Sequence, residues 1–116
     1  MPREIILYCF ESGKCPVEEF LDSLTAKQFE KVAFVFDLIE QLDVVPQAYF
    51  KKMEGTKDLW EVRVQSGRMI FRFLGFLDEG TLVILAHAFA KKTQKISSRD
   101  IELVEQRKRD YFARKR

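Results

Sequence analysis

Three short strand-like runs between Lys57 and Lys95 constrain the fold of this chain more than any other feature. They read LWEVRVQ, RMIFRFLGF and TLVILAHAF, and glycine lies in the short segments that separate them. Runs rich in β-branched and aromatic residues with such turns between them are typical of consecutive antiparallel strands. The sequence therefore predicts a β-meander with cationic side chains placed along it.

The first turn of this meander decides which cations share a face. A two-residue loop at Ser66-Gly67 would use the glycine for the positive φ that such loops need. Glu61 would then lie opposite Arg72, and Arg63 would share their side, because alternate side chains of a strand point the same way. The cations expected together on this face are Arg63, Arg68 and Arg72.

The second turn, around Asp78-Glu79-Gly80, leaves the position of His87 open. A two-residue loop at Glu79-Gly80 places His87 opposite Arg72, whereas a three-residue loop shifts the pairing by one and turns His87 to the other face. Histidine is the side chain whose charge ordinarily changes near neutral pH, so His87 is a candidate acid or base if it reaches the site.

The rest of the chain predicts helices around this meander. Thr25 with Gln28 three residues later matches a capping box, and apolar residues then recur at helical spacing to about Leu42. The expected elements are a strand over 4–10, helices over 16–24 and 25–42, a connector over 48–56 and a C-terminal helix over about 98–114. Ser97 with Asp100 matches a second capping box and is expected to open this last helix. We therefore expect an α+β fold, in which the N-terminal strand and two helices pack on an antiparallel meander.

Composition predicts one domain over residues 1–116, since 116 residues with 47% hydrophobic composition suffice for one core and not for two. No run approaches the roughly 18 apolar residues of a membrane span. Met1 leads into a short apolar run unlike a signal peptide, which favours a cytoplasmic protein. Two cysteines and one histidine cannot form a familiar zinc set, so Cys9 and Cys15 are expected to be reduced thiols.

The net charge of +2 conceals an asymmetry along the chain. Residues 1–50 carry four Lys/Arg against nine Asp/Glu, and residues 51–116 carry sixteen against nine. The second half is therefore the expected polyanion-binding half. The basic residues of the last helix, from Arg107 to Arg116, are expected to form a frayed and solvated terminus.

Three sequence segments resemble those of a known family. KKMEGTKDLWEVRV, RMIFRF and LAHAFAKKTQKIS resemble segments of the RelE/ParE superfamily of toxins, and in particular its phage-derived HigB-type branch. The likeness covers about residues 4 to 112. It implies a RelE-like small domain that enters the ribosomal decoding site and cuts messenger RNA, without a metal or an organic cofactor.

The resemblance also implies partners. They would be a cognate helix-turn-helix antitoxin of the HigA type, messenger RNA and the ribosome, with operator DNA reached only through the antitoxin complex and no membrane. Two alternatives stay open. Relatives in the ParE branch poison DNA gyrase, so the chain could be a non-catalytic inhibitor that binds gyrase or another protein. A decayed toxin could also persist as an antitoxin-bound, DNA-binding repressor partner.

RNA cleavage needs a group that takes the proton of a ribose 2′-OH and cations that stabilise the charge on the phosphorane. The expected catalytic residues are Arg63, Arg72, His87 and Lys91, and the expected RNA-binding residues are Lys52, Lys57, Arg68, Lys92 and Lys95. Four of these residues have an alternative without function. Arg72 could form an ion pair with Glu61, and His87 could be a buried histidine whose hydrogen bonds are satisfied. Lys91 and Lys92 could be exposed for solubility alone.

Overall fold

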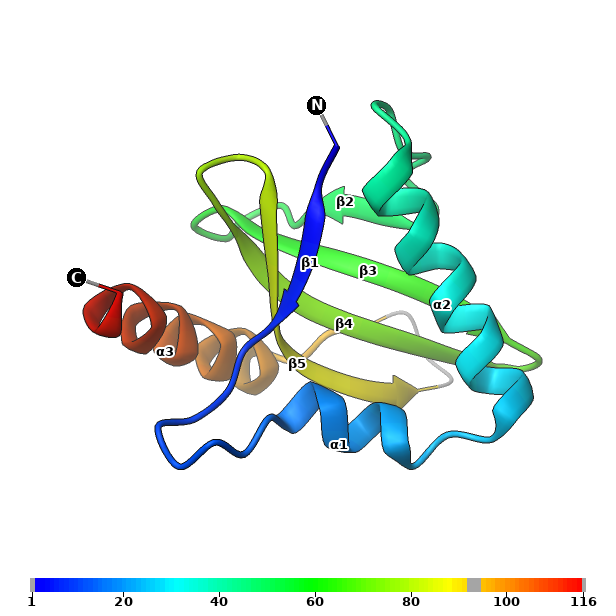
Figure 1. Ribbon diagram of the computed structural model, residues 1–116, viewed down its shortest axis with the longest axis horizontal. Helices are drawn as coiled ribbons and strands as arrows, with labels where there is room; N and C mark the ends of the chain where they lie inside the picture. The colour runs from blue at the N-terminus through cyan, green and yellow to red at the C-terminus, as the bar shows by residue number, and fades with distance from the viewer. Residues whose placement is uncertain (1, 92–94, 116) are drawn as a thin grey trace.

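The computed structural model describes residues 2–91 and 95–115, and Lys92 lies outside this range. A five-stranded sheet forms its centre (Figure 1). In chain order the elements are β1 (Glu4–Leu7), α1 (Pro16–Asp22), α2 (Ala26–Gln41), β2 (Phe50–Lys52), β3 (Leu59–Ser66), β4 (Met69–Asp78), β5 (Leu82–Lys91) and α3 (Ser98–Arg114). The fold is α+β, as the sequence predicted.

The sheet has the strand order β1-β5-β4-β3-β2, and the predicted meander β3-β4-β5 is its core. Two edge strands were not predicted as such. β1 pairs with β5 in parallel, so the sheet is mixed rather than wholly antiparallel. β2 pairs with β3 inside the segment that the sequence indicated as a connector, and with three residues it is too short to show an alternating pattern.

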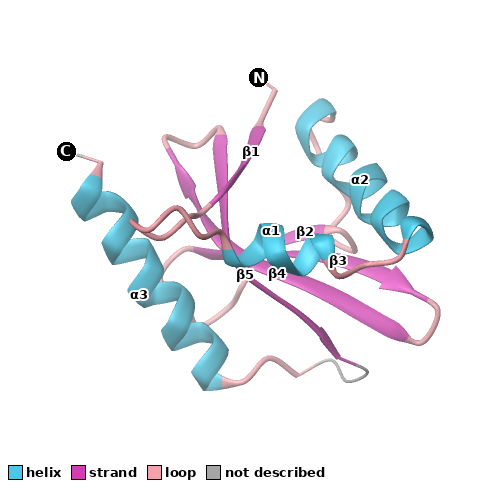
Figure 2. Ribbon diagram, turned by 60° about the horizontal axis from the view of Figure 1, so that its bottom comes forward, coloured by secondary structure: helices cyan, strands magenta, loops and turns pink. Residues whose placement is uncertain are grey.

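Helices cover both faces of this sheet, and Figure 2 shows α2 and α3 on either side of it. α1 and α2 pack on one face over a core that includes Val17, Val32, Ile39, Val62 and Phe73. α3 packs on the other face over a second core that includes Tyr8, Leu59, Leu74, Phe76, Ile84 and Val104. Both longer helices begin with the capping boxes expected from the sequence, at Thr25–Gln28 and at Ser97–Asp100.

The predicted loop of the first hairpin was wrong by one residue, which shifts the strand pairing by two. The loop is Gly67-Arg68, with Ser66 paired to Met69 and Arg63 paired to Arg72. Gly67 has a φ of 60° and Arg68 is not among the residues with positive φ. A two-residue loop with glycine at its first position is the II′ type, which suits the twist of the flanking strands and places the loop one residue later.

The second hairpin has a three-residue loop, since Asp78 pairs with Leu82. A β-bulge then shifts the register again: Gly75 pairs with Leu85 but Leu74 pairs with His87, so Ala86 is the extra residue. The bulge cancels the change of face that the three-residue loop imposes. His87 therefore lies on the α3 face, two positions from the partner of Arg72.

The C-terminal helix stays regular to Arg114, so the expectation of a frayed terminus was wrong, whereas residues 112–115 are exposed to solvent as expected. Arg107 Nη1 donates to the carbonyl of Ala86 at 2.5 Å, which satisfies the backbone of the bulge. Near the end, Lys115 Nζ lies 2.7 Å from Asp78 Oδ2, and the Tyr111 hydroxyl donates to the same carboxylate at 2.8 Å. Burial and this hydrogen bond raise the pKa of Tyr111 to about 12.

The expectation of two reduced thiols was also wrong. Cys9 and Cys15 form a disulfide across the turn between β1 and α1. Backbone hydrogen bonds from Phe10 N to Lys14 O and from Gly13 N to Phe10 O close this turn. The turn brings the two cysteines together, and nothing in their spacing alone indicated it.

Candidate functional site

Charged side chains gather on the α3 face of the sheet, beyond the apolar core that α3 covers. The strand pairing arranges them in rows that run across the sheet. The first row holds Lys51, Glu61, Leu74 and His87, the second holds Arg63, Arg72 and Phe89, and the third holds Gln65, Ile70 and Lys91. We call Lys51, Glu61, Arg63, Arg72, His87, Lys91 and the nearby Asp100 the charged cluster.

Glu61 joins the two arginines of this cluster. Its Oε2 atom accepts a hydrogen bond from Arg72 Nη1, and Arg63 Nε lies 3.6 Å from the same oxygen. The side chains of Glu61 and Arg72 are both 2% exposed, whereas that of Arg63 is 23% exposed. Arg72 is therefore buried together with Glu61, and Arg63 is the arginine of this group whose side chain reaches solvent.

Asp100 makes a similar junction on the other side of the cluster. It projects from the first turn of α3, and its Oδ1 atom lies 2.9 Å from His87 Nε2. Its Oδ2 atom lies 3.5 Å from Lys91 Nζ and accepts from Ser97 Oγ at 2.7 Å. Burial alone raises the pKa of Asp100, but hydrogen bonds from His87 and Ser97 outweigh it and hold that pKa at about 2.

The charged cluster has an excess of positive charge. It contains four permanent cations, on Lys51, Arg63, Arg72 and Lys91, against the two carboxylates of Glu61 and Asp100. A cavity of about 820 Å³ passes over this part of the sheet, and its lining includes Lys51, Lys52, Arg63 and Arg72 together with Ile96 and Ile101. A cavity with this lining suits an anionic ligand that also carries apolar surface.

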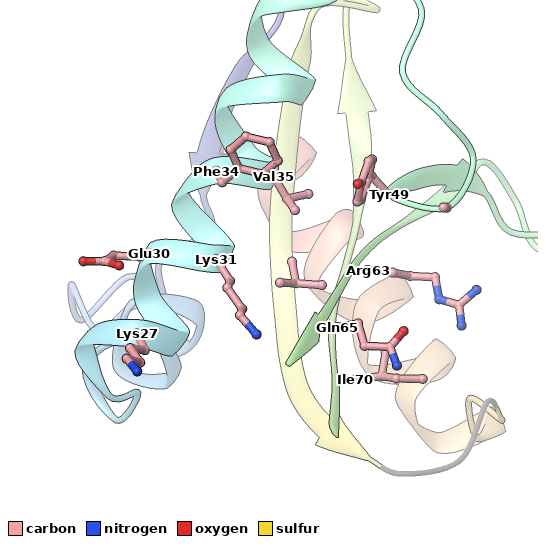
Figure 3. A pocket seen from close by; sticks show the side chains of 11 residues that line it. Lys27, Glu30, Lys31, Phe34, Val35, Tyr49, Arg63, Gln65 and Ile70 are labelled. Atoms are coloured by element: carbon pink, nitrogen blue, oxygen red, sulfur yellow. The ribbon is translucent and has the colours of Figure 1, made fainter. Parts of the chain in front are cut away.

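A second cavity, of about 800 Å³, lies between α2 and the end of β3 (Figure 3). Phe34, Val35, Tyr49 and Ile70 give it an apolar lining, and Lys27 and Lys31 add charge. Arg63 lines both cavities. In Figure 3 its side chain points away from α2, in keeping with its place on the α3 face.

The structure brings together all four residues that the sequence predicted as catalytic, Arg63, Arg72, His87 and Lys91, on one face of the sheet. Of the predicted RNA-binding residues, Lys52 lines the same cavity as Arg63 and pairs with Asp58 at 2.8 Å. Lys95 is exposed in the segment that leads into α3.

Other predicted residues lie elsewhere. Lys57 belongs to the loop between β2 and β3, where its carbonyl accepts from Lys108 of α3, and it lines a separate cavity with α3 residues. Arg68 is exposed in the β3–β4 loop and therefore does not share a strand face with Arg63 and Arg72. Lys92 lies outside the described residues.

Two members of the cluster were not predicted from the sequence. Lys51 lies opposite Glu61 on β2, in the segment that the sequence indicated as a connector. Asp100 was noticed only as part of a helix-capping box. Both are charged residues in the segments that flank the meander, and this is the signal that could have indicated them. It identifies them as neighbours of Glu61 and His87 only once the strand pairing is known.

None of the helices in the described residues is long and apolar enough to cross a bilayer. Within residues 2–91 and 95–115, no group of three or more His, Cys, Asp or Glu side chains is placed to hold a metal ion.

The strand order, the helices on both sides and the cationic face define a RelE-like fold. A chain of the archaeal RelE–RelB complex from Pyrococcus horikoshii OT3 superposes with a TM-score of 0.51 and 17% identity, over 82% of this chain and 100% of that one. The sequence family described as "Phage derived protein Gp49-like (DUF891)" matches residues 19–109. The chain belongs to this Gp49-like family, and the RelE-like fold that the resemblance implied is confirmed. No curated protein matches.

The ionised Asp100 gives a prediction for stability against pH. Because its folded pKa of about 2 lies below the ordinary value of 3.8, its contribution is fully present above pH 4 and is lost as the pH falls towards 2. The difference corresponds to about 2 kcal/mol. Between pH 5 and pH 2 the free energy of unfolding, measured by urea denaturation, should fall by about this much more for the wild type than for Asp100→Asn. Parallel curves would contradict this role.

Proposed function

We propose that this chain is the toxin of a type II toxin–antitoxin pair and that it cuts messenger RNA on the ribosome. The observation that carries the proposal is the charged cluster, in which a partly exposed arginine, two lysines and a histidine share one face of the sheet. Membership of the Gp49-like family and the RelE-like fold support the toxin assignment.

The proposed chemistry is an attack of a ribose 2′-OH on the adjacent phosphate. The attacking oxygen loses its proton to His87, the bond from phosphorus to the 5′ oxygen breaks, and the leaving oxygen takes up a proton from solvent water. The products are a 2′,3′-cyclic phosphate and a free 5′-OH. Atoms and charge balance without an oxidant, a reductant or a bound metal.

The cations of the charged cluster have separate proposed roles in binding the RNA and stabilising the phosphorane. Arg63 is the more exposed of the two arginines, at 23% against 2% for Arg72, and its planar guanidinium can bind two phosphate oxygens and stabilise the phosphorane. Lys51 and Lys91 stand in the neighbouring rows on either side, where an RNA backbone crossing the sheet would meet them. Arg72 is too deeply buried to contact the RNA phosphate directly. Its role in this proposal is to hold Glu61, which in turn orients Arg63.

The proposed partner is an antitoxin that silences this cationic face, by analogy with the RelE–RelB complex whose RelE-like chain shares the fold. An antitoxin segment with negative charge would complement the excess of cations in the charged cluster. We expect the neighbouring gene to encode a helix-turn-helix protein of the HigA type. Location in the cytoplasm, where translating ribosomes are found in bacteria, belongs to the same proposal.

The test is induction of the chain in bacterial cells without an antitoxin, with the 5′ ends of messages mapped. The wild type should stop growth and produce cuts inside translated codons. Arg63→Ala should relieve the arrest and remove the cuts, because the partly exposed guanidinium is lost while the buried Glu61–Arg72 pair stays. Arg109→Ala is the matched control, since it removes an exposed arginine from α3 and should leave toxicity unchanged.

Two results would overturn this assignment. Normal growth with intact messages, from a folded and soluble product, would remove the toxin and the nuclease together. Growth arrest with intact messages and induction of the DNA-damage response would instead favour inhibition of DNA gyrase, the alternative that the ParE branch of the superfamily suggests.

A further inference from the structure

His87 and Asp100 form a pair that joins the sheet to α3, and the pair is more than a helix cap. The His87 side chain is 18% exposed and the Asp100 side chain is 16% exposed, so solvent only partly screens the contact between them. The backbone N and the hydroxyl of Ser97 both donate to Oδ2 of Asp100, at 3.2 and 2.7 Å. Capping therefore occupies Oδ2, and Oδ1 is left to His87 at 2.9 Å.

The geometry determines which ring nitrogen carries the proton. An ionised carboxylate has no proton to donate, so the contact between Oδ1 and Nε2 is a hydrogen bond only if Nε2 is the donor. In a neutral imidazole Nδ1 then keeps its lone pair. Among the described residues, no hydrogen bond to Nδ1 is present.

We propose that Asp100 is a positioning residue that holds His87 in the tautomer with the proton on Nε2, which leaves Nδ1 as the base that accepts the proton of the ribose hydroxyl. This inference rests on the proposed function for its last step and on the structure alone for the tautomer. It assigns to the capping box of α3 a second task, the orientation of a side chain on β5.

Contacts around His87 hold its side chain in the orientation that faces Asp100. The bulge at Ala86 turns His87 to the α3 face, and Arg107 fixes that bulge from α3 at 2.5 Å. The Phe89 ring lies 5.1 Å from the imidazole between centroids and limits its rotation. His87 and Asp100 thus sit on elements that are tied to each other, as an oriented acid–base pair requires.

The test is Asp100→Asn in the full chain, read by nitrogen NMR of the imidazole. His87 is the only histidine, so its ring signals are unambiguous. The wild type should show the Nε2–H tautomer. In Asp100→Asn the amide oxygen can keep the cap at Ser97, and the amide nitrogen then donates to Nε2 and forces the proton to Nδ1. Ribosome-dependent cleavage should fall in kcat by about 100-fold or more, with KM within about threefold.

Ser97→Ala is the matched control, because it removes the capping hydroxyl and leaves Oδ1 in place. It should lower stability by about 1 kcal/mol without changing the tautomer. Asp100→Glu should restore part of the cleavage rate, since a carboxylate can still accept from Nε2.

Four outcomes would contradict the proposal in whole or in part, or separate it from the proposed function. A wild-type ring with the proton on Nδ1, or an Asp100→Asn ring unchanged from the wild type, would overturn it. A switched tautomer with an unchanged cleavage rate would overturn the catalytic step. A wild-type protein with the expected tautomer and no nuclease activity would refute the proposed function while supporting the orientation of His87 by Asp100.

Discussion

Arg72→Ala is expected to lower the free energy of unfolding by about 3–5 kcal/mol, and so to abolish function through loss of the fold. The change removes the guanidinium that binds the carboxylate of Glu61, and both side chains are 2% exposed. Glu61 would keep Arg63 at 3.6 Å but lose its buried partner. Removing one member of a buried ion pair leaves a desolvated charge, which is costlier than removing both. Urea denaturation followed by circular dichroism measures the effect.

Two further variants identify the cause. The double variant Glu61→Leu with Arg72→Met replaces the pair by apolar side chains and should recover much of the lost stability. Arg68→Ala removes an exposed arginine from the β3–β4 loop and should change stability by less than about 0.5 kcal/mol. An Arg72→Ala protein within 1 kcal/mol of the wild type would show that Arg72 is not the support of Glu61 that the structure indicates.

Gly75→Ala is expected to cost about 3 kcal/mol or more and to displace His87. A Cβ atom at residue 75 would lie 1.8 Å from the carbonyl oxygen of Ile84 and 2.8 Å from its carbon. Both are backbone atoms of the adjacent strand, so no side chain can move aside to make room. β4 and β5 would have to separate at the bulge, which is the feature that turns His87 towards Asp100.

Gly67→Ala is the matched control for this substitution. Gly67 has a φ of 60°, but a Cβ there would meet nothing within 4 Å. Its cost should be only the backbone strain, about 1–2 kcal/mol. Denaturation curves compare the two variants, and the imidazole signals of the single histidine show whether its surroundings change. A Gly75→Ala protein as stable as Gly67→Ala, with the wild-type histidine signals, would contradict the role given to the bulge.

The meander and the capped helices were predictable because each follows from local pattern. Alternation along β3, the apolar run of β4 and the two capping boxes are visible within a few residues of sequence. The edge strands were not predictable in the same way, since β2 has three residues and β1 takes its direction from pairing with β5. Non-local pairing decides such strands.

The candidate site was predictable in its residue types and not in its geometry. Gly67 took the first position of its loop, which shifted Arg72 from opposite Glu61 to opposite Arg63. The face of His87 depended on two features together, a three-residue loop and a bulge. Gly75 within an apolar strand was the available signal for the bulge, because a glycine inside a strand often marks one.

The division of labour between the two arginines follows from burial, which the sequence did not reveal. Both were expected to bind phosphate, yet the side chain of Arg72 is 2% exposed and is bound to Glu61, whereas that of Arg63 is 23% exposed. Substitution of each arginine should therefore distinguish the two roles. Arg63→Ala should remove activity from a folded protein, whereas Arg72→Ala should remove the fold.

The central claim is most directly tested with purified protein, translating ribosomes and a defined message, by measuring the rate at which the message is cut. We predict cleavage that requires ribosomes and falls about 100-fold or more in Arg63→Ala, whose free energy of unfolding stays within about 1 kcal/mol of the wild type. A message that stays intact on translating ribosomes at every concentration of folded wild-type protein would contradict the account.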